Sequence, residues 1–372
     1  MLGVKYFAVD AKLFSVGPKK LTGTFAFSLL AVLLLLTSAI LDLMADRWSN
    51  PVTSLTLPIL VCGLAAGLLG YGVVPMLQWL KTGQVIREDG PQAHLRKAGT
   101  PTMGGVFFVP VAVLVALLWS GFAPEAVAAS ALTLAYGFIG WVDDWQILRQ
   151  KSNKGISPRA KLAGQIGFAL LFCLWLAVTQ PASITDVALP FGLVLPLGLL
   201  FWPLAAFVMV SESNATNITD GVDGLMGGTG AIALFGLGAL VADKSPSLMV
   251  FCACMSGACL GFLAHNRNPA RVFMGDTGSL ALGGALAAVG LLSGSLWSLF
   301  LISGIFFVES LSVIAQVSYY KATKGPDGKG KRLLKMAPMH HHLELSGWSE
   351  INIVAAFYGI QAILVLLAWL IL

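Results

Sequence analysis

The sequence predicts an all-α integral membrane protein, a polytopic bundle of about ten or eleven transmembrane helices. Three observations predict this fold class. The 372 residues are 57% hydrophobic and 11% charged, with a mean hydropathy of +0.82, which is typical of a membrane protein. Many apolar runs approach the roughly 20 residues that a helix needs to cross a bilayer. Lipid offers no hydrogen bonds to the backbone, so each run is expected to be helical.

The apolar runs follow one another along the whole chain. Polar or turn-forming residues separate them, and the two runs that meet near residues 293–296 can also be interpreted as one broken helix. The expected helices cover residues 23–44, 53–80, 101–120, 124–142, 162–180, 191–210, 225–242, 247–264, 279–294, 296–317 and 351–372.

Lys and Arg predict the orientation, since basic residues concentrate in cytoplasmic loops. If the helices alternate in direction, 21 of the 23 basic residues fall on one side of the membrane, and only Arg47 and Lys244 fall on the other. We therefore expect a cytoplasmic N-terminus and an external C-terminus. The net charge of +5 follows from this topology and does not indicate nucleic-acid binding.

We expect two parts in the chain. Residues 1–50 form an N-terminal tail with one additional transmembrane helix at 23–44, and residues 51–372 form the polytopic domain. The start lacks a short apolar stretch followed by a small-residue cleavage site, so 23–44 is interpreted as a retained helix or signal-anchor. All five cysteines lie in apolar runs, which favours buried packing over a disulfide framework or a metal site.

A polar, acidic stretch at residues 217–224 lies between two apolar runs. Polar residues are costly inside a membrane protein and usually mark a working surface. Asn217, Asp220 and Asp223 are spaced three apart and would share one face of a helix. Two carboxylates and an amide on one face suit a metal-bound phosphate. A hydrated loop with good turn and cap residues is the alternative.

Two adjacent carboxylates, Asp143 and Asp144, follow the run at 124–142. Successive helical residues point about 100° apart, so we expect one to act directly and the other to support it or to serve a second substrate. A helix end exposed to water is the alternative. Lys161, which follows in a basic loop at the start of the next helix, can attract an anionic lipid head group. For most of that loop, topology alone explains the charges equally well.

The loop at 265–278 adds a third acid. Asp276 lies between glycines at a helix start, a suitable place for a metal-binding carboxylate, and Phe273 could stack on a nucleobase. A helix N-cap formed by Asp276 or Ser279 is the alternative. Glu309 lies within an apolar run, and we expect it to face the interior of the bundle.

Two further segments are candidates for phosphate or nucleotide binding. Residues 83–105 carry Lys97 and Thr102 in a Gly- and Pro-rich segment that leads into a helix and could cradle a phosphate or a uracil. An ordinary basic loop is the simpler interpretation of that composition. Three consecutive histidines at 340–342 point in different directions, which argues against a three-His zinc site and favours hydrogen bonding to phosphate or a pocket wall.

Together these clusters converge on the predicted cytoplasmic face. Carboxylates there would hold Mg²⁺, and the metal and the nearby cations would hold phosphates. The sequence therefore predicts phosphoryl transfer at a lipid–water boundary, where positioning and charge neutralisation supply most of the rate.

Five segments of the chain form a distinctive set. They read AGTPTMGG at 98–105, GWVDD at 140–144, NITDGVDGL at 217–225, VFMGD at 272–276 and MAPMHHH at 336–342. This set resembles the phospho-N-acetylmuramoyl-pentapeptide transferase family, within the superfamily of polyprenyl-phosphate N-acetylhexosamine-1-phosphate transferases. The resemblance covers about residues 53–372, and the triple histidine favours this family over others in the superfamily.

The resemblance implies a bacterial inner-membrane enzyme with its active site on the cytoplasmic face. Its substrates would be UDP-MurNAc-pentapeptide and undecaprenyl phosphate, its products lipid I and UMP, and its cofactor Mg²⁺. By position, Asp276 would bind the metal, and Asp143 and Asp144 would serve the metal and the lipid phosphate. The remaining residues implied by position are Lys97, Thr102, Asn217, Asp220, Asp223, Asn266 and Phe273 at the nucleotide, and Lys161, His340, His341 and His342 at phosphates or nearby groups.

The resemblance leaves several points open. Residues 23–44 form a helix that the family usually lacks, and His265 stands where an aromatic residue is common. The oligomeric state, a homodimer included, and the accepted peptide variant are not fixed by the sequence. A related transferase that uses UDP-GlcNAc is the nearest alternative activity. A transporter or Mg²⁺ channel is the alternative from another class, and it would place acids near helix midpoints.

We expect a lipid phosphate oxygen to attack the β-phosphorus of the UDP-sugar and displace UMP. Asp143 is a candidate base for the lipid phosphate. A phosphate monoester has a second pKa of about 6, so most of it is already dianionic at neutral pH. We therefore expect metal and positional catalysis to outweigh general-base catalysis.

Overall fold

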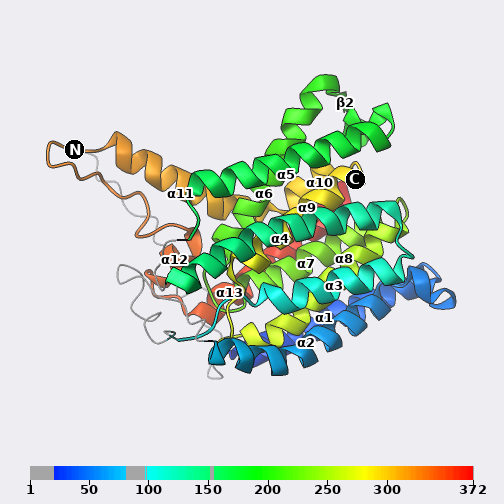
Figure 1. The fold of residues 1–372 in the computed structure, drawn as a ribbon, viewed down its shortest axis with the longest axis horizontal. Helices are drawn as coiled ribbons and strands as arrows, with labels where there is room; N and C mark the ends of the chain where they lie inside the picture. Colours follow the sequence, from blue (N-terminus) through cyan, green and yellow to red (C-terminus); the bar gives the residue numbers. More distant parts are fainter. Residues whose placement is uncertain (1–20, 81–96, 98, 151–154, 372) are drawn as a thin grey trace.

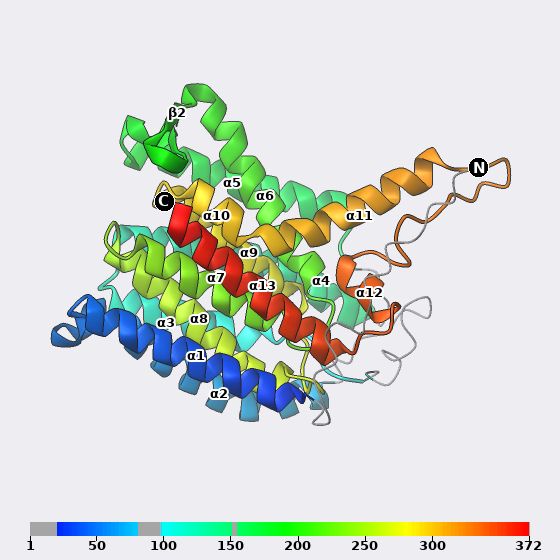
Figure 2. The same cartoon turned by 180° about the vertical axis from the view of Figure 1, so that it is seen from behind.

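The computed structural model describes residues 21–80, 97, 99–150 and 155–371. The expected tail before residue 21 and residues 81–96 of the first cytoplasmic loop lie outside these residues. The helices run roughly side by side in one bundle, as Figure 1 shows from one side and Figure 2 from the other. They are α1 (Gly23–Met44), α2 (Thr56–Trp79), α3 (Gly105–Trp119), α4 (Pro124–Gln150), α5 (Pro158–Thr179), α6 (Phe201–Thr219), α7 (Leu225–Val241), α8 (Pro246–Asn266), α9 (Gly275–Leu292), α10 (Leu296–Ile302), α11 (Gly304–Ala322), α12 (Met339–Glu344) and α13 (Glu350–Ile371).

Seven of the described helices are long and apolar enough to cross a membrane, and α10 with α11 supplies an eighth span if the bent pair is counted as one. Helices α3 and α7 are shorter apolar helices, and the second half of α6 is polar. The prediction of a polytopic membrane bundle is confirmed.

The prediction of a helix at 191–210 is wrong in its first ten residues. A two-stranded antiparallel hairpin, β1 (Asp186–Ala188) and β2 (Val194–Pro196), and short 3-10 turns occupy residues 182–200 instead. Gly192 and Gly198 have positive φ, and Pro190 and Pro196 have no N–H to donate to a helix. Helix α6 therefore starts at Phe201 and continues to Thr219, so it reaches Asn217.

The helix predicted at 296–317 is broken in the structure. Helices α10 and α11 meet at Ser303 with a bend of 67°, and α11 extends to Ala322. A helix end leaves carbonyl groups without partners. Here the Gln361 amide donates to the Ile302 carbonyl at 2.7 Å, and the Ser303 hydroxyl contacts the buried Glu212 carboxyl. These contacts from α13 and α6 satisfy polar groups at the break.

Helices α8 and α9 form the centre of the bundle. In each, 89% of the most apolar 18-residue stretch is buried, compared with 17% in α1. A helix that is apolar on all sides belongs in a core, and the rows of small residues in α8 and α9 fit that position. Helix α1 lies on the outside beside α2 (Figure 2).

Two glycines let α9 begin between α3 and α4. A Cβ at Gly140 of α4 would lie 2.1 Å from the Asp276 carbonyl oxygen, and a Cβ at Gly105 of α3 would lie 2.3 Å from the Gly278 nitrogen. Any larger residue would force the helices apart. The first turn of α9 is therefore fixed against the end of α4 that carries Asp143 and Asp144.

Candidate active site

Polar side chains from four helices meet at the first turn of α9. Asp276 lies in that turn, and its carboxylate contacts the Lys161 ammonium of α5. The other carboxylate oxygen accepts a hydrogen bond of 2.7 Å from the Asn217 amide of α6, which also donates to Ser279. We call Asp143, Asp144, Asp276, Lys161 and Asn217 the acid cluster.

The alternative that Asp276 or Ser279 caps the helix is wrong. Helix α9 begins at Gly275, four residues earlier than expected, so both residues lie inside it, and its N-cap residue is Met274. The Asp276 carboxylate is 24% exposed and partnered across helices by Lys161 and Asn217. A carboxylate in this position is available to a ligand.

Asp144 is the member of the acid cluster that binds the backbone at the start of α9. Its side chain is buried and accepts hydrogen bonds from the Asp276 backbone N–H at 3.2 Å and from the Thr277 N–H and hydroxyl at 2.9 and 2.6 Å. A carboxylate at a helix N-terminus satisfies donors that have no partner within the helix. Asp144 therefore holds the first turn of α9, and with it Asp276, in place.

Asp143 has a different environment. Both aspartates lie inside α4, which continues to Gln150, and not at a helix end as expected. The Asp143 carboxylate accepts a hydrogen bond of 2.8 Å from the Ile156 backbone N–H and lies within electrostatic reach of Asp276 and Lys161. The two adjacent carboxylates thus separate into one that faces Asp276 and one that holds the start of α9.

The stretch at 217–224 is not one helical face. Helix α6 ends at Thr219, so Asn217 lies in its last turn, while Asp220 and Asp223 lie in the connection to α7. Burial raises the pKa of Asp220 to about 8, and the negative charges of Asp276, Asp144 and Asp223 add to this effect. Asp220 therefore lies within electrostatic reach of both the acid cluster and Asp223.

A second group of polar residues lies beside Asp220. The Lys97 ammonium contacts the carboxylates of Asp223 and Glu350, each at 2.8 Å. The Asn268 amide donates to the same two carboxylates at 3.2 and 2.9 Å. Burial alone would lower the pKa of Lys97, but the two carboxylates outweigh burial and raise it. We call Lys97, Asp223, Asn268 and Glu350 the lysine cluster.

Sequence reasoning found Lys97 and Asp223 but missed Asn268 and Glu350. Glu350 is the first residue of α13, where an acid is expected for a helix N-terminus on general grounds. Asn268 precedes a proline in a loop and gives no separate signal. Neither pattern could indicate contacts with residues 45 to 253 positions away along the chain.

Short backbone contacts place Thr102 and Phe273 next to each other. The Phe273 N–H donates to the Pro101 carbonyl at 2.8 Å, and the Gly104 N–H donates to the Phe273 carbonyl at 2.8 Å. A Cβ at Gly275 would lie 2.6 Å from an Asp144 oxygen and 2.8 Å from the Thr102 hydroxyl. Thr102 therefore lies at the acid cluster.

Asn266 and His265 have structural contacts. The Asn266 side chain accepts from the Gly224 N–H and donates to the Val272 carbonyl, both at 2.9 Å, so its polar atoms hold two backbone segments together. The His265 ring nitrogen Nε2 is paired with the Gly67 carbonyl at 2.8 Å and joins α8 to α2. These two bonds leave one N–H and one lone pair of the Asn266 amide for a further contact.

The first histidine of the triple differs from the other two. The buried His340 ring pairs through Nδ1 with Glu309 of α11 at 3.0 Å, and its other ring nitrogen, Nε2, has no hydrogen-bond partner among the described residues. A Cβ at Gly221 would lie 2.2 Å from this Nε2 atom, so the ring edge faces the backbone beside Asp220. Glu309 is fully buried, as predicted, and orients His340.

His341 and His342 point elsewhere. His341 pairs with Glu344 at 2.6 Å, and the His342 Nδ1 atom accepts from the Lys335 N–H at 3.2 Å. Burial and the charge of Lys335 lower the pKa of His342. Within the described ranges, no three His, Cys, Asp or Glu side chains are grouped as ligands of one metal ion.

The fold and these contacts define a multi-pass membrane protein with a carboxylate- and lysine-lined site at one end of its helix bundle. Residues 126–294 match the model of glycosyl transferase family 4. Residues 97–109, which include Lys97 and Thr102, match the phospho-N-acetylmuramoyl-pentapeptide-transferase signature 1.

Relatives over nearly the whole chain specify the family. The chain is 70% identical over 357 residues to the phospho-N-acetylmuramoyl-pentapeptide-transferase of Nostoc sp., with 96% of this chain and 97% of that protein covered. It is 65% identical over 363 residues to the protein of the same name from Gloeothece citriformis, with 97% and 100% covered. The chain belongs to the phospho-N-acetylmuramoyl-pentapeptide-transferase family. Because so few residues of this chain are left unmatched, the matched region includes α1.

Proposed function

We propose that this protein transfers phospho-MurNAc-pentapeptide from UDP-MurNAc-pentapeptide to undecaprenyl phosphate, giving lipid I and UMP in peptidoglycan synthesis. The name shared by relatives at 59–70% identity supports the donor and the reaction. The observation that carries the proposal within the structure is the acid cluster, in which Lys161 and Asn217 present the Asp276 carboxylate. This arrangement suits the handling of phosphate groups and has no evident purpose in a structural membrane protein.

Mg²⁺ fits the donor set. Mg²⁺ prefers oxygen ligands and is usually held by one or two carboxylates together with substrate phosphates and water, so a group of three protein ligands is not required. Asp276 is partly exposed, and it interacts with the more buried Asp143. We propose that these two carboxylates hold the ion. When bound, Mg²⁺ would neutralise charge on the pyrophosphate as UMP leaves.

The chain's own residues would place the two substrates. We propose that Lys97, Asp223 and Phe273 contact the uridine part of the donor, and that Thr102 contacts its phosphates. Lys161 is the cation next to Asp276 and would hold the phosphate of the acceptor lipid. His340, oriented by Glu309, presents the Nε2 atom that has no protein partner to a group near Asp220.

In the transfer step, an oxygen of the lipid phosphate forms a bond to the β-phosphorus of the donor. The bond from that phosphorus to the bridging oxygen breaks, and the bridging oxygen leaves on UMP. Asp143 can accept the proton of a monoanionic lipid phosphate. Above pH 6 most of the lipid phosphate has already lost this proton, so the contribution of Asp143 as a base is small there.

We further propose that the site lies on the cytoplasmic side of a bacterial inner membrane. Among the described basic residues, Lys97, Lys161, Arg267, Arg271 and the group at 321–335 lie in or next to connections at the end of the bundle that carries the site, as expected for cytoplasmic loops. Labelling of an introduced Cys residue at exposed position 327 in intact cells and in inverted vesicles tests this orientation. If a membrane-impermeant reagent labels this Cys in intact cells but not in inverted vesicles, the orientation is the opposite of the one proposed.

The defining experiment measures UMP release by the purified protein from UDP-MurNAc-pentapeptide with polyprenyl phosphate, with and without Mg²⁺. We expect UMP release that requires both the lipid and the metal. UDP-GlcNAc in place of the donor tests the nearest alternative, and turnover of UDP-GlcNAc alone would replace the proposed activity. Mg²⁺ flux through protein in liposomes without turnover would support the transporter or channel alternative.

A further inference from the structure

A groove with a volume of about 310 Å³ lies between α1, α2 and α8. Its lining contains only apolar side chains, glycines and one tyrosine. Along α2 the groove extends from Ile59 to Tyr71, which is about 18 Å of helix. Leu64 and Leu68 at its outer edge are 65% and 69% exposed, so the groove opens sideways toward the lipid. Its size and lining suit a hydrocarbon chain.

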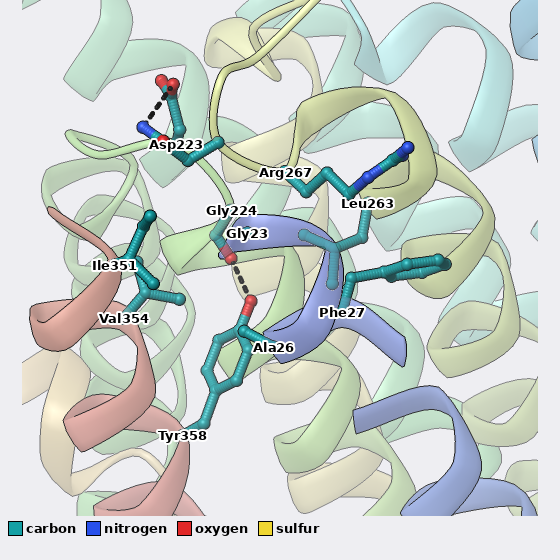
Figure 3. Close-up of a pocket in the computed structure, with 11 residues that line it drawn as sticks. Gly23, Ala26, Phe27, Asp223, Gly224, Leu263, Arg267, Ile351, Val354 and Tyr358 are labelled. Carbon is teal, nitrogen blue, oxygen red and sulfur yellow. Dashed lines mark hydrogen bonds between the residues drawn. The ribbon is translucent and has the colours of Figure 1, made fainter. Parts of the chain in front are cut away.

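Two arginines stand at one end of this groove. The Arg267 guanidinium lies 5.5 Å from the centre of the Phe27 ring, and the Arg271 guanidinium lies 5.9 Å from the centre of the Tyr71 ring. Phe27 and Tyr71 both line the groove, on α1 and α2. Figure 3 shows Arg267 next to Phe27 at the first turn of α1.

Among the described residues, no carboxylate neutralises the two arginines. Arg267 donates from Nε to the Thr24 hydroxyl at 3.2 Å, and in the described part of the chain neither arginine forms an ion pair with a carboxylate. A guanidinium has five N–H donors in a planar fork that fits phosphate oxygens. Most of these donors remain available.

We propose that this groove binds an anionic phospholipid of the surrounding membrane, with one acyl chain along α2 and the head-group phosphate held by Arg267 and Arg271. Basic pockets between transmembrane helices at the cytoplasmic end are suited to anionic lipid head groups. The bound lipid joins the outer helix α1 to the α2–α8 pair. None of the acid-cluster residues lies on these three helices, so this site is separate from the one proposed for the acceptor substrate.

A second groove on the other side of α1 provides an internal comparison. It lies between α1, α7 and α13, has a volume of about 570 Å³ and, like the first groove, has no charged side chain in its lining. The rings that the two arginines approach, Phe27 and Tyr71, line the α1–α2–α8 groove and not this one. The arginines therefore distinguish the α1–α2–α8 groove as the one that should prefer an anionic lipid.

The test is the titration of the full-length protein in neutral detergent with phosphatidylglycerol, and separately with phosphatidylcholine of the same chains. Native mass spectrometry counts the bound lipids. A juxtamembrane arginine typically contributes about fivefold in affinity for anionic lipid. We expect Arg271→Gln to weaken phosphatidylglycerol binding about fivefold and the double variant Arg267→Gln/Arg271→Gln about thirtyfold. Phosphatidylcholine binding should not change.

Two matched controls separate the groove from general effects. Lys324→Gln/Lys329→Gln removes two exposed charges from another connection at the same end of the bundle and should leave binding unchanged. Ala31→Phe fills the groove and should remove the site, whereas Leu36→Phe adds a ring to an exposed position of α1 that lines neither groove. Size-exclusion profiles identify any variant that fails to fold, and the exposed Arg271→Gln keeps the test decisive if others fail.

Several outcomes would overturn the proposal. Equal affinity for the two phospholipids in the parent protein would mean that no head group is recognised. Unchanged phosphatidylglycerol binding in Arg271→Gln or in Ala31→Phe would place the lipid elsewhere. Displacement of the bound phosphatidylglycerol by an equimolar amount of undecaprenyl phosphate, with loss of transfer in Ala31→Phe, would make the groove an acceptor-substrate site instead.

Discussion

The acid cluster and the lysine cluster meet near Asp220 but are built in different ways. The acid cluster stands on helices α4, α5, α6 and α9, and close contacts at Gly140 and Gly105 fix the helix start that carries Asp276. The lysine cluster joins residues from connections and helix ends that are distant in sequence. A rigid helical site suits the bond-changing step, and ion pairs that can exchange for substrate contacts suit binding. The clusters should therefore affect kcat and KM differently.

The largest effect is expected from Asp276→Asn. The change removes the charge that pairs with Lys161 and the main carboxylate proposed for Mg²⁺. We expect kcat to fall about a thousandfold or more, as when a preorganised electrostatic partner of the transition state is lost. The measurement is UMP release at saturating substrates, with the thermal unfolding midpoint as control. A loss of less than tenfold would remove Asp276 from the centre of the reaction.

A smaller loss with a different signature is expected from Asp144→Asn. The asparagine keeps one acceptor oxygen but cannot satisfy all three donors at the start of α9. Leaving buried donors unpaired costs about 1–3 kcal/mol, so the unfolding midpoint should fall together with kcat, by roughly ten- to a hundredfold in rate. Unchanged stability with full loss of activity would mean that Asp144 acts on the substrate directly.

Substitutions in the lysine cluster should raise KM more than they lower kcat. Glu350→Gln leaves Lys97 with one carboxylate partner, so the lysine is held less firmly. Charged hydrogen bonds contribute about 1.5–3 kcal/mol, and we expect KM for the UDP donor to rise about tenfold while kcat stays within threefold. Glu350→Asp should restore part of the affinity, and Asp327→Asn, on an exposed loop, serves as the matched control. A fall in kcat at constant KM would contradict the division between the clusters.

Composition and the length of the apolar runs predicted most of the bundle, because apolar runs of bilayer length have few alternatives to a helix. The errors lie where local chemistry decides. Residues 191–200 are apolar enough to form part of a membrane span, yet Pro190, Pro196 and two glycines with positive φ impose a hairpin and turns. The bend at Ser303 depends on contacts from Gln361 and Glu212, which no local pattern reveals.

The candidate site was predictable in its residue types and less so in its contacts. Carboxylates in polar gaps indicated Asp143, Asp144 and Asp276, and their adjacency indicated that two would differ in role. The sequence could not show that Asp144 holds the start of α9, because the partner lies 132 residues further along the chain. The role of Glu350 was not predicted for the same reason. An acid at a helix start is common, and only the structure shows that Lys97 pairs with this one.

The smallest effect is expected from Asp143→Asn. This variant also separates the role of Asp143 from that of Asp276 most clearly. The lipid phosphate has a second pKa of about 6, so at pH 8 it is a dianion and needs no base. The asparagine keeps an oxygen that can accept from the Ile156 N–H and contact a metal ion. We therefore expect a loss of less than tenfold at pH 8 that grows as the pH falls below 6, where the phosphate holds a proton that Asp143 can remove. Rates of UMP release from pH 5.5 to 8.5, with Asp276→Asn for comparison, test this. A loss of several orders of magnitude at pH 8 would show that Asp143 is as essential as Asp276 and would end the distinction between them.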